Sequence, residues 1–224
     1  MLNSPAVLKF PLTSPQLAGR KQECRRQLLE LRRQFSLETG LCLSHKINQL
    51  ITCLPEFRNA TAVAAYAATP GEVDLLECSQ VALDSGKLLL FPRFNAVAKG
   101  YDMVPIQTLA GGLRPGRFGI REPASEIPAY DSGKMAGAKI IWLVPGVGFD
   151  RAGRRLGRGK GYYDRLLTGV SGVKIGVAFS WQIWPVLPAA TNDVMMDIIV
   201  SESGIMRSSL AATKTQNNPG QSVP

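Results

Sequence analysis

Short hydrophobic runs alternate along the chain with segments in which hydrophobic positions recur every three or four residues. The short runs are typical of strands buried on both faces, and the longer pattern is typical of amphipathic helices. We expect strands at 61–68, 87–91, 102–106, 139–144, 173–179 and 196–200. We expect helices over 16–35, from Ser36 as N-cap up to Pro55, over 73–84 and over 161–167.

This alternation predicts an α/β fold: a single three-layer domain whose largely parallel central sheet is flanked by helices. In such sheets function gathers at the carboxyl ends of the strands, so we expect chemistry in the loops after 68, 91, 144 and 179. Residues 107–137 carry many glycines and prolines and are interpreted as long loops. The predicted organisation is a loose leader (1–15), a catalytic domain (16–203) and a disordered C-terminal tail (204–224).

Composition narrows the classes of function. The 224 residues are 45% hydrophobic and 19% charged, which excludes a mostly disordered chain. Four cysteines without a C-x-x-C pair and a single histidine leave almost no ligands for a structural zinc site. No hydrophobic run approaches the roughly 20 residues that span a bilayer, so we expect a cytoplasmic protein without a membrane partner. The formal net charge of +9 suits an anionic partner.

The most informative segment follows the strand expected at 139–144 and reads GFDRAGRRLGRGKGYYDRLL. Three glycines alternate here with Arg158 and Lys160, so backbone N–H groups and cations are presented together, as a polyphosphate requires. The segment is not a P-loop, because Lys160 is followed by Gly161 instead of Ser or Thr. On spacing alone, a solvated basic turn explains the segment equally well. Two neighbouring tyrosines offer planar surfaces, and Asp164 could hold a Mg²⁺ ion that bridges phosphates.

This segment closely resembles the signature of the 5-formyltetrahydrofolate cyclo-ligase family, also called methenyltetrahydrofolate synthetases. The resemblance spans about residues 20–202. It includes a K-x-x-x-R pattern that begins at Lys21, the Glu-Val pair at Glu72, F-P-R at 91–93, Y-D-M at 101–103, G-I-R-E-P at 119–123 and the N-D…D element at 192–197. Asn192 stands where many bacterial members have His, and Phe118 stands where Trp also occurs.

The resemblance implies an ATP- and Mg²⁺-dependent ligase that closes 5-formyltetrahydrofolate to 5,10-methenyltetrahydrofolate and releases ADP and phosphate. It assigns ATP binding to Lys21, Arg25, Arg155, Leu156, Gly157, Arg158, Gly159, Lys160, Gly161, Tyr162 and Tyr163. It assigns the folate to Tyr66, Glu72, Phe118, Arg158, Gly159, Lys160, Gly161 and Tyr162, with Glu72 on the pterin ring. Asp164 and Asp193 are the implied Mg²⁺ residues.

Two other functions remain open from the residues. A basic nucleic-acid-binding protein would explain the net charge and the Arg/Lys-Gly segment beside tyrosines. A small-molecule kinase of similar fold would use the same nucleotide site on another acceptor. The expected partners are nevertheless the folate substrate and ATP, without nucleic acid, and we expect a monomer.

Overall fold

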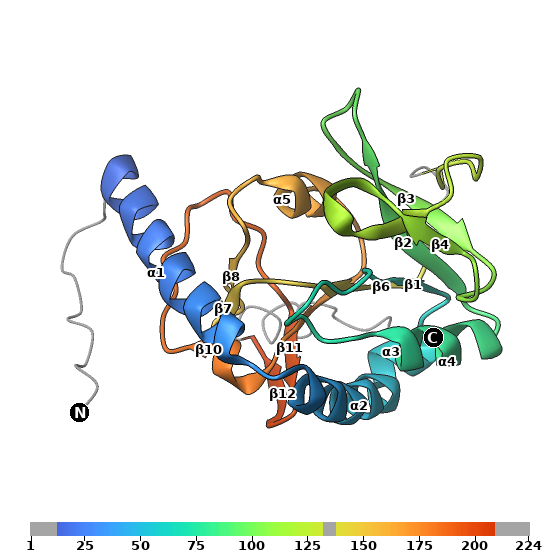
Figure 1. The fold of residues 1–224 in the computed structure, drawn as a ribbon, viewed down its shortest axis with the longest axis horizontal. Helices are drawn as coiled ribbons and strands as arrows, with labels where there is room; N and C mark the ends of the chain where they lie inside the picture. The colour runs from blue at the N-terminus through green and yellow to red at the C-terminus, as the bar shows by residue number, and fades with distance from the viewer. Residues whose placement is uncertain (1–12, 132–137, 209–224) are drawn as a thin grey trace, which may run out of the picture.

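A computed structural model describes residues 13–131 and 138–208 of the chain (Figure 1). Its central sheet has seven strands, in the spatial order β12 (Gly204–Arg207), β11 (Ile198–Ser201), β9 (Val173–Val177), β6 (Ile140–Val144), β1 (Ala62–Ala64), β2 (Leu88–Asn95) and β3 (Gly100–Ile106). The five inner strands, from β11 to β2, pair in parallel, whereas β12 and β3 run antiparallel at the two edges. The predicted α/β fold with a largely parallel sheet is confirmed.

Helices cover the sheet on both faces. One core joins alternate strand residues such as Ile141 and Leu143 to helices α2 (Leu37–Cys53), α3 (Pro55–Asn59) and α4 (Leu76–Asp84). The residues between them in β6, such as Trp142, face a second core that contains Leu167 of α5 (Tyr162–Leu167). This period-two alternation of apolar side chains, all of them buried, explains why the strands read as continuous hydrophobic runs.

The long helix α1 (Ser14–Gln34) packs on a second, small sheet formed by β10 (Ile183–Trp184), β7 (Gly148–Asp150) and β8 (Arg155–Leu156) (Figure 1). Leu28 of α1 is fully buried and belongs to the same cluster as Leu156. The approach is close, because a Cβ atom on Gly148 would lie 2.6 Å from Cδ1 of Leu28. This docking places the basic side of α1 beside the glycine-rich segment that follows β8.

Part of the region interpreted as loops is ordered into short elements. Strands β4 (Leu113–Pro115) and β5 (Arg121–Pro123) form an antiparallel pair, and the 3₁₀ turn η1 (Arg117–Gly119) connects them. Strands this short carry too few residues to show a hydrophobic period. Residues 132–137 of this region lie outside the described residues. A second 3₁₀ turn, η3 (Ser180–Gln182), follows β9.

The two domain boundaries differ from the prediction. Residues 204–207 were assigned to the disordered tail but form β12, which pairs with β11 after a turn at residues 202–203. An edge strand is held by backbone hydrogen bonds on one side, so its sequence needs no strong hydrophobic pattern. At the other end α1 begins at Ser14, two residues earlier than expected, behind the N-cap Thr13. Residues 1–12 and 209–224 of the predicted leader and tail lie outside the described residues.

The expected first strand is shorter than its apolar run. β1 ends at Ala64, and the chain then runs irregularly as far as α4, which starts at Leu76 instead of residue 73. Two side-chain contacts fix this connection: the Tyr66 hydroxyl donates to the Val73 carbonyl (3.0 Å), and the Asp74 carboxylate accepts from the Leu76 N–H (2.8 Å). The irregular stretch after β1 forms one wall of the cavity described next.

Candidate active site

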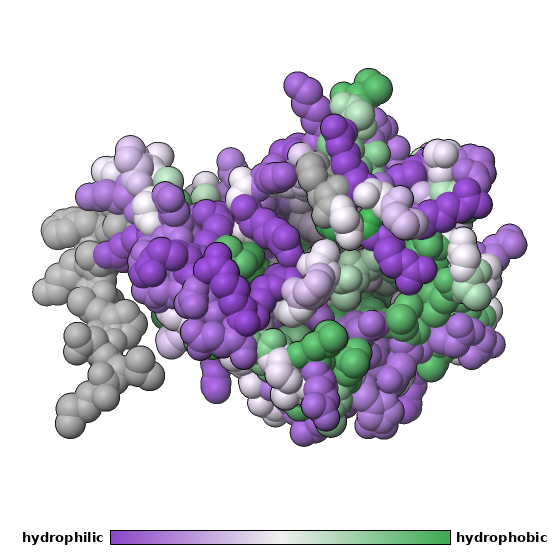
Figure 2. Space-filling model, in the orientation of Figure 1, coloured by the Kyte–Doolittle hydropathy of each residue, from purple (hydrophilic) through white to green (hydrophobic). Residues whose placement is uncertain are grey.

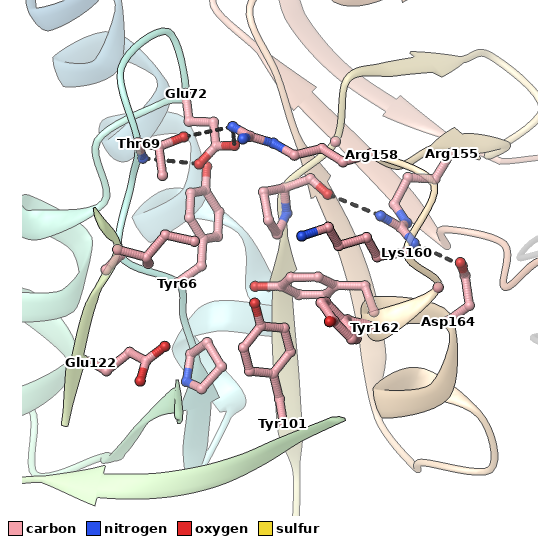
Figure 3. A pocket seen from close by; sticks show the side chains of 17 residues that line it. Tyr66, Thr69, Glu72, Tyr101, Glu122, Arg155, Arg158, Lys160, Tyr162 and Asp164 are labelled. Carbon is pink, nitrogen blue, oxygen red and sulfur yellow. Dashed lines mark hydrogen bonds and ion pairs between the residues drawn. The ribbon is translucent and has the colours of Figure 1, made fainter. Parts of the chain in front are cut away.

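A cavity of about 240 Å³ lies where β1 and β6 end, at the carboxyl edge of the parallel strands (Figure 3). This is the position at which open α/β sheets bind ligands. Its volume suits one ring system of a ligand, since pockets for whole drug-sized molecules span roughly 300–1,000 Å³. The lining residues are Tyr66, Ala67, Thr69, Glu72, Pro92, Tyr101, Ile120, Glu122, Pro145, Gly146, Arg155, Arg158, Lys160, Gly161, Tyr162, Tyr163 and Asp164.

The glycine-rich segment connects β8 to α5 and forms one side of the cavity. Gly159 (φ +93°) and Gly161 (φ +66°) adopt left-handed backbone conformations that a side chain would strain. The helix α5 is only six residues long, so we attribute the anion-binding capacity of this segment to loop N–H groups and cations more than to a helix dipole. Lys160 and Arg158 project from the loop into the cavity region (Figure 3).

Arg155 and Asp164 form an ion pair at the base of this segment. The Arg155 Nη2 donates to Oδ1 of Asp164 at 2.7 Å, and the Arg155 side chain is only 4% exposed. Its Nε is buried and has no hydrogen-bond partner among the described residues. A buried, incompletely satisfied guanidinium that lines a cavity favours an anionic ligand there. The half-buried Asp164 keeps its second oxygen available for another contact.

Glu72 is held by an unexpected network. Its Oε1 accepts from Arg158 at 3.2 Å and forms an ion pair with Arg32 at 3.3 Å, and its Oε2 accepts from the Thr69 N–H at 3.0 Å. Both guanidinium groups also donate to the Thr69 hydroxyl, from Arg32 at 2.9 Å and from Arg158 at 2.8 Å. The network joins α1, the connection after β1 and the glycine-rich loop. Figure 3 shows the part of it formed by Thr69, Glu72 and Arg158.

Tyrosine rings form the remaining apolar surface of the cavity. Tyr101 and Tyr162 meet edge-to-face, with ring centroids 5.5 Å apart. Burial raises the pKa of Tyr66, Tyr101 and Tyr163 above the ordinary value, and nearby carboxylates raise these pKa values further. The three phenols therefore stay protonated near neutral pH. The Tyr66 hydroxyl is already used on Val73, so this residue offers its ring to a ligand.

A second group of predicted residues lies on the α1 side of the glycine-rich loop. Lys21 and Arg25 are four residues apart and so share one face of the helix. The Lys21 ammonium contacts Oδ2 of Asp193 at 2.5 Å, and the Arg25 Nε donates to the Gly157 carbonyl at 2.8 Å. These two contacts tie α1 to the loop and to the segment before β11. Neither side chain lines the described cavity.

The structure thus brings most predicted site residues to one place, in two groups. The members that line the cavity are Tyr66, Glu72, Arg155, Arg158, Lys160, Gly161, Tyr162, Tyr163 and Asp164. Lys21, Arg25, Gly157, Gly159 and Asp193 lie on the α1 side or in the backbone of the loop. The Leu156 side chain is buried in the core beneath α1, so only its backbone could face a ligand. The side chain of Phe118 lies outside the described residues.

Three cavity residues, and Arg32 beside the cavity, were not assigned a role from the sequence. Arg32 was treated as one of several basic residues on a helix, and Thr69 lies in a stretch that carries no motif. Tyr101 and Glu122 fall within segments that resemble the family, Y-D-M and G-I-R-E-P, and these matches were the available signal. Thr69, Tyr101 and Glu122 line the cavity, and Arg32 contacts Glu72 there from α1. The four residues come from segments distant in sequence, and periodicity and spacing do not report such convergence.

The donor set fits ATP with Mg²⁺. The glycine-rich loop offers backbone N–H groups and carries the cations Arg158 and Lys160. The cations Lys21 and Arg25 lie beside it on α1. Together these groups have the chemistry of a polyphosphate site. Among the described residues no group of three or more His, Cys, Asp or Glu side chains could hold a metal ion by itself. Mg²⁺ commonly takes one or two carboxylates together with phosphate oxygens and water, so Asp164 and Asp193 would suffice once phosphates are bound.

Comparisons with known proteins show the family of the chain. The family model described as the 5-formyltetrahydrofolate cyclo-ligase family matches residues 18–202. A probable 5-formyltetrahydrofolate cyclo-ligase of Caenorhabditis elegans is 34% identical over 155 residues, which cover 65% of this chain and 75% of the relative. The 5-formyltetrahydrofolate cyclo-ligase of Mus musculus is 27% identical over 190 residues (81% and 93%).

A solved structure is also similar. The NMR structure of the Aquifex aeolicus 5,10-methenyltetrahydrofolate synthetase superposes with a TM-score of 0.72 at 35% identity, and the match covers 91% of this chain and 96% of that one. The residues that the family model matches include the glycine-rich loop. The chain therefore belongs to the 5-formyltetrahydrofolate cyclo-ligase family, as its sequence predicts.

Proposed function

We propose that this protein catalyses the ATP- and Mg²⁺-dependent closure of 5-formyltetrahydrofolate to 5,10-methenyltetrahydrofolate, with release of ADP and phosphate. Beyond family membership, one observation carries the proposal. The cationic glycine-rich loop forms a wall of the same cavity that Tyr66, Tyr101 and Glu72 line. A phosphate-binding element and an aromatic, polar ring site are thereby adjacent, as transfer of a phosphoryl group to a folate requires.

The chain's own groups bind and position the reactants. ATP would supply the phosphoryl group that makes the formyl oxygen a leaving group, and Mg²⁺ would offset the charge of its phosphates. Lys160 and Arg158 neutralise negative charge at the cavity, and Lys21 with Arg25 do so from α1. No nucleophilic side chain is needed, because phosphoryl transfer depends chiefly on positioning and charge neutralisation. The bridging amine nitrogen N10 of the folate would then attack the formyl carbon, and phosphate and the N10 proton would leave.

The folate side of the cavity consists of planar rings and hydrogen-bonding groups. Tyr66 and Tyr162 border the ring system, and Glu72 with Arg158 forms a polar end at which substrate groups are oriented. Phe118 stays a proposed substrate contact on the resemblance alone. Asp164 and Asp193 are the proposed Mg²⁺ residues, each with one oxygen engaged by a cation of the chain and the other available.

A spectrophotometric assay tests this function. The purified protein, incubated with 5-formyltetrahydrofolate, should develop the near-ultraviolet absorbance of the conjugated methenyl product only when ATP and Mg²⁺ are both present. Product formation without ATP, or none with it, contradicts the proposal. A stable phosphorylated product without ring closure indicates a small-molecule kinase instead.

The remaining predictions concern the location, the oligomeric state and the partners of the protein. Among the described residues, no helix combines the length and the hydrophobicity needed to cross a bilayer. A cytoplasmic location, a monomeric state and the absence of a nucleic-acid partner stay predictions. The last of these is testable, because a nucleic-acid binder loses affinity linearly in the logarithm of salt concentration.

A further inference from the structure

A fully buried carboxylate, that of Asp150, lies at the end of β7 and outside the cavity lining. Its Oδ1 accepts from the N–H groups of Ala152 and Arg154, each at 3.0 Å. Its Oδ2 accepts from the Arg154 Nη1 at 3.2 Å and from the Leu187 N–H at 2.9 Å. Both oxygens of this buried charge are therefore satisfied by donors of the chain.

The two oxygens hold different parts of the chain. Oδ1 closes the turn between β7 and β8 through N–H groups that follow closely in sequence, which is a common local use of an aspartate. Oδ2 also reaches Leu187, which lies in the segment after β10. Shaping a turn does not require this second contact. The bond to the Leu187 N–H is thus the feature of Asp150 that a role in the turn leaves unexplained.

The same turn also holds the far end of that segment. The Met196 N–H donates to the Gly153 carbonyl at 2.8 Å. A Cβ atom on Gly153 (φ +88°) would clash with the Met196 carbonyl, so the two backbones approach closely. Residues 187–196 therefore form a loop, here called the 187–196 loop, and both its ends are attached to the turn at residues 150–153.

This turn connects the two proposed Mg²⁺ residues. Asp193 lies in the 187–196 loop, where its Oδ2 accepts from the Ala190 N–H at 2.7 Å. On the other side, the turn leads directly into β8 and so to Arg155, which forms the ion pair with Asp164. The carboxylates of Asp164 and Asp193 come from separate segments, and the turn at residues 150–153 is a structural link between those segments.

The geometry points to Asp150 as a positioning residue that holds the 187–196 loop, and with it Asp193, in place relative to the glycine-rich loop. This inference rests on the proposed function. Mg²⁺ requires nearly octahedral coordination with ligand distances of about 2.0–2.1 Å, so a small displacement of one carboxylate lowers its affinity. Asp150 acts through the backbone of the 187–196 loop, as groups behind metal ligands commonly do.

Asp150→Asn separates the long-range contact from the turn. Asparagine keeps one oxygen for the N–H groups of the turn but places an NH₂ group opposite the Leu187 N–H, so two donors face each other. The first control is Arg154→Met, because it removes the other partner of Oδ2 and leaves the bond to Leu187. The second is Asn48→Ala, which removes a buried amide that joins α2 to α4 and has no hydrogen bond to the 187–196 loop.

Binding of a non-hydrolysable ATP analogue to the full-length protein, measured over a series of Mg²⁺ concentrations, is the first test. We expect Asp150→Asn to raise the Mg²⁺ concentration for half-maximal binding by about 10- to 100-fold, the usual effect of losing a group behind a metal ligand. Binding of the analogue without Mg²⁺ should stay unchanged. Arg154→Met and Asn48→Ala should require as much Mg²⁺ as the wild type.

Two results of this test overturn the inference. One is an unchanged Mg²⁺ requirement in Asp150→Asn. The other is an equal rise in Asn48→Ala, because the effect would then follow from lost stability alone. Analogue binding by the wild type that does not depend on Mg²⁺ overturns the proposed function as well, so the two failures are distinguishable.

Hydrogen exchange of the ligand-free protein tests the attachment itself. The Leu187 N–H should exchange slowly in the wild type, as N–H groups bonded within a fold do. In Asp150→Asn, exchange should become faster within the 187–196 loop and stay unchanged in α2 and α4, whereas Asn48→Ala should show the reverse. Rapid exchange of the wild-type Leu187 N–H overturns the inference without the use of any variant. An Asp150→Asn protein that does not fold assigns the residue to stability, which also contradicts a positioning role.

Discussion

At the scale of single residues, the two arginines that share Glu72 differ in burial. The Arg32 side chain is 10% exposed, and the Arg158 side chain is 56% exposed. Burial lowers the pKa of Arg32, and the charge of Glu72 opposes this effect. Arg32 is therefore the structural partner of Glu72, and Arg158 is the partner that can rearrange when a ligand enters the cavity.

This difference predicts unequal stability effects. Arg32→Met should lower the free energy of unfolding by about 2 kcal/mol, because it removes hydrogen bonds from a buried carboxylate. Arg158→Met should lower it by less than about 1 kcal/mol, because the side chain is half-exposed. Urea denaturation of both variants measures the two values. Equal losses would contradict the assignment of distinct roles, whereas turnover should fall in both variants.

Asp164 combines a proposed metal contact with a structural one. Asp164→Ala removes the partner of the buried Arg155 and should destabilise the fold by about 1–3 kcal/mol. Asp164→Asn keeps an oxygen that can accept from Arg155, so its loss of stability should be smaller. We expect Mg²⁺-dependent turnover to fall at least about 100-fold in both variants. Asp84→Asn, an exposed site on α4, is the control. An active Asp164→Asn enzyme would argue against the metal role.

The residues of the site differ in how far the sequence predicted them. The loop from Arg155 to Asp164 was predictable, since alternating glycines and cations are unusual and lie within one short segment. The network of Arg32, Thr69 and Glu72 was not, because its members come from separate elements and its geometry depends on how α1 docks. Glu122 likewise was not predicted, because only the fold brings it into the cavity lining.

At the scale of elements, the docking of α1 depends on one close approach. A side chain on Gly148 of β7 would meet Leu28 of α1. Gly148→Ala should therefore destabilise the protein by about 1–3 kcal/mol through overpacking. In a Leu28→Ala background the cost of Gly148→Ala should be smaller, because the truncated residue leaves space. Urea denaturation of the single and double variants measures this coupling. Additive effects would show that the two residues do not limit the approach of α1.

The edge strand β12 is linked to α3 by an ion pair between Arg207 and Glu56, with 2.6 Å from Nη1 to Oε1. The hydrogen bond from Arg207 lowers the pKa of Glu56. A carboxylate whose pKa is lower in the folded state stabilises the fold above its ordinary pKa, and this contribution disappears as pH falls through the lowered value.

We therefore expect Glu56→Gln to be less stable than the wild type at pH 7, by up to about 1 kcal/mol. The difference should shrink as the pH falls below the ordinary pKa of a glutamate and through the lowered pKa of Glu56. Urea denaturation at a series of pH values measures it. Glu30→Gln, at a more exposed ion pair on α1, should show a smaller difference of the same sign, because water screens that pair. A difference for Glu56→Gln that grows in acid would contradict the sign of the pKa shift.

The elements that the sequence predicted best were those with long apolar patterns. The helix that becomes α2 was predicted with its N-cap, and Ser36 does accept from the Thr39 N–H at 3.1 Å. The inner strands were predicted because burial on both faces makes them continuously hydrophobic. The short strands were missed, since two to four residues held by backbone pairing leave no period to detect; they are β4, β5, β7, β8, β10 and β12.

At the scale of the whole molecule, polar residues gather over α1 on the face shown in Figure 2. The chain is strongly basic as a whole, yet the cations that matter to the proposed reaction are the few placed by the fold around the glycine-rich loop. We expect the remaining basic residues to raise the local concentration of the proposed anionic substrates through long-range attraction. Added salt distinguishes these two contributions, because it weakens long-range attraction far more than direct contacts of the cations around the loop.

The central claim is that the segment from Arg155 to Asp164 binds the triphosphate of a nucleotide beside the folate cavity. A crystal structure of the protein with Mg²⁺ and a non-hydrolysable ATP analogue tests it most directly. The account predicts phosphate oxygens within hydrogen-bonding distance of the N–H groups of residues 157–161, with the terminal phosphate directed toward the cavity. A nucleotide bound elsewhere, with this segment facing bulk solvent, would contradict the account.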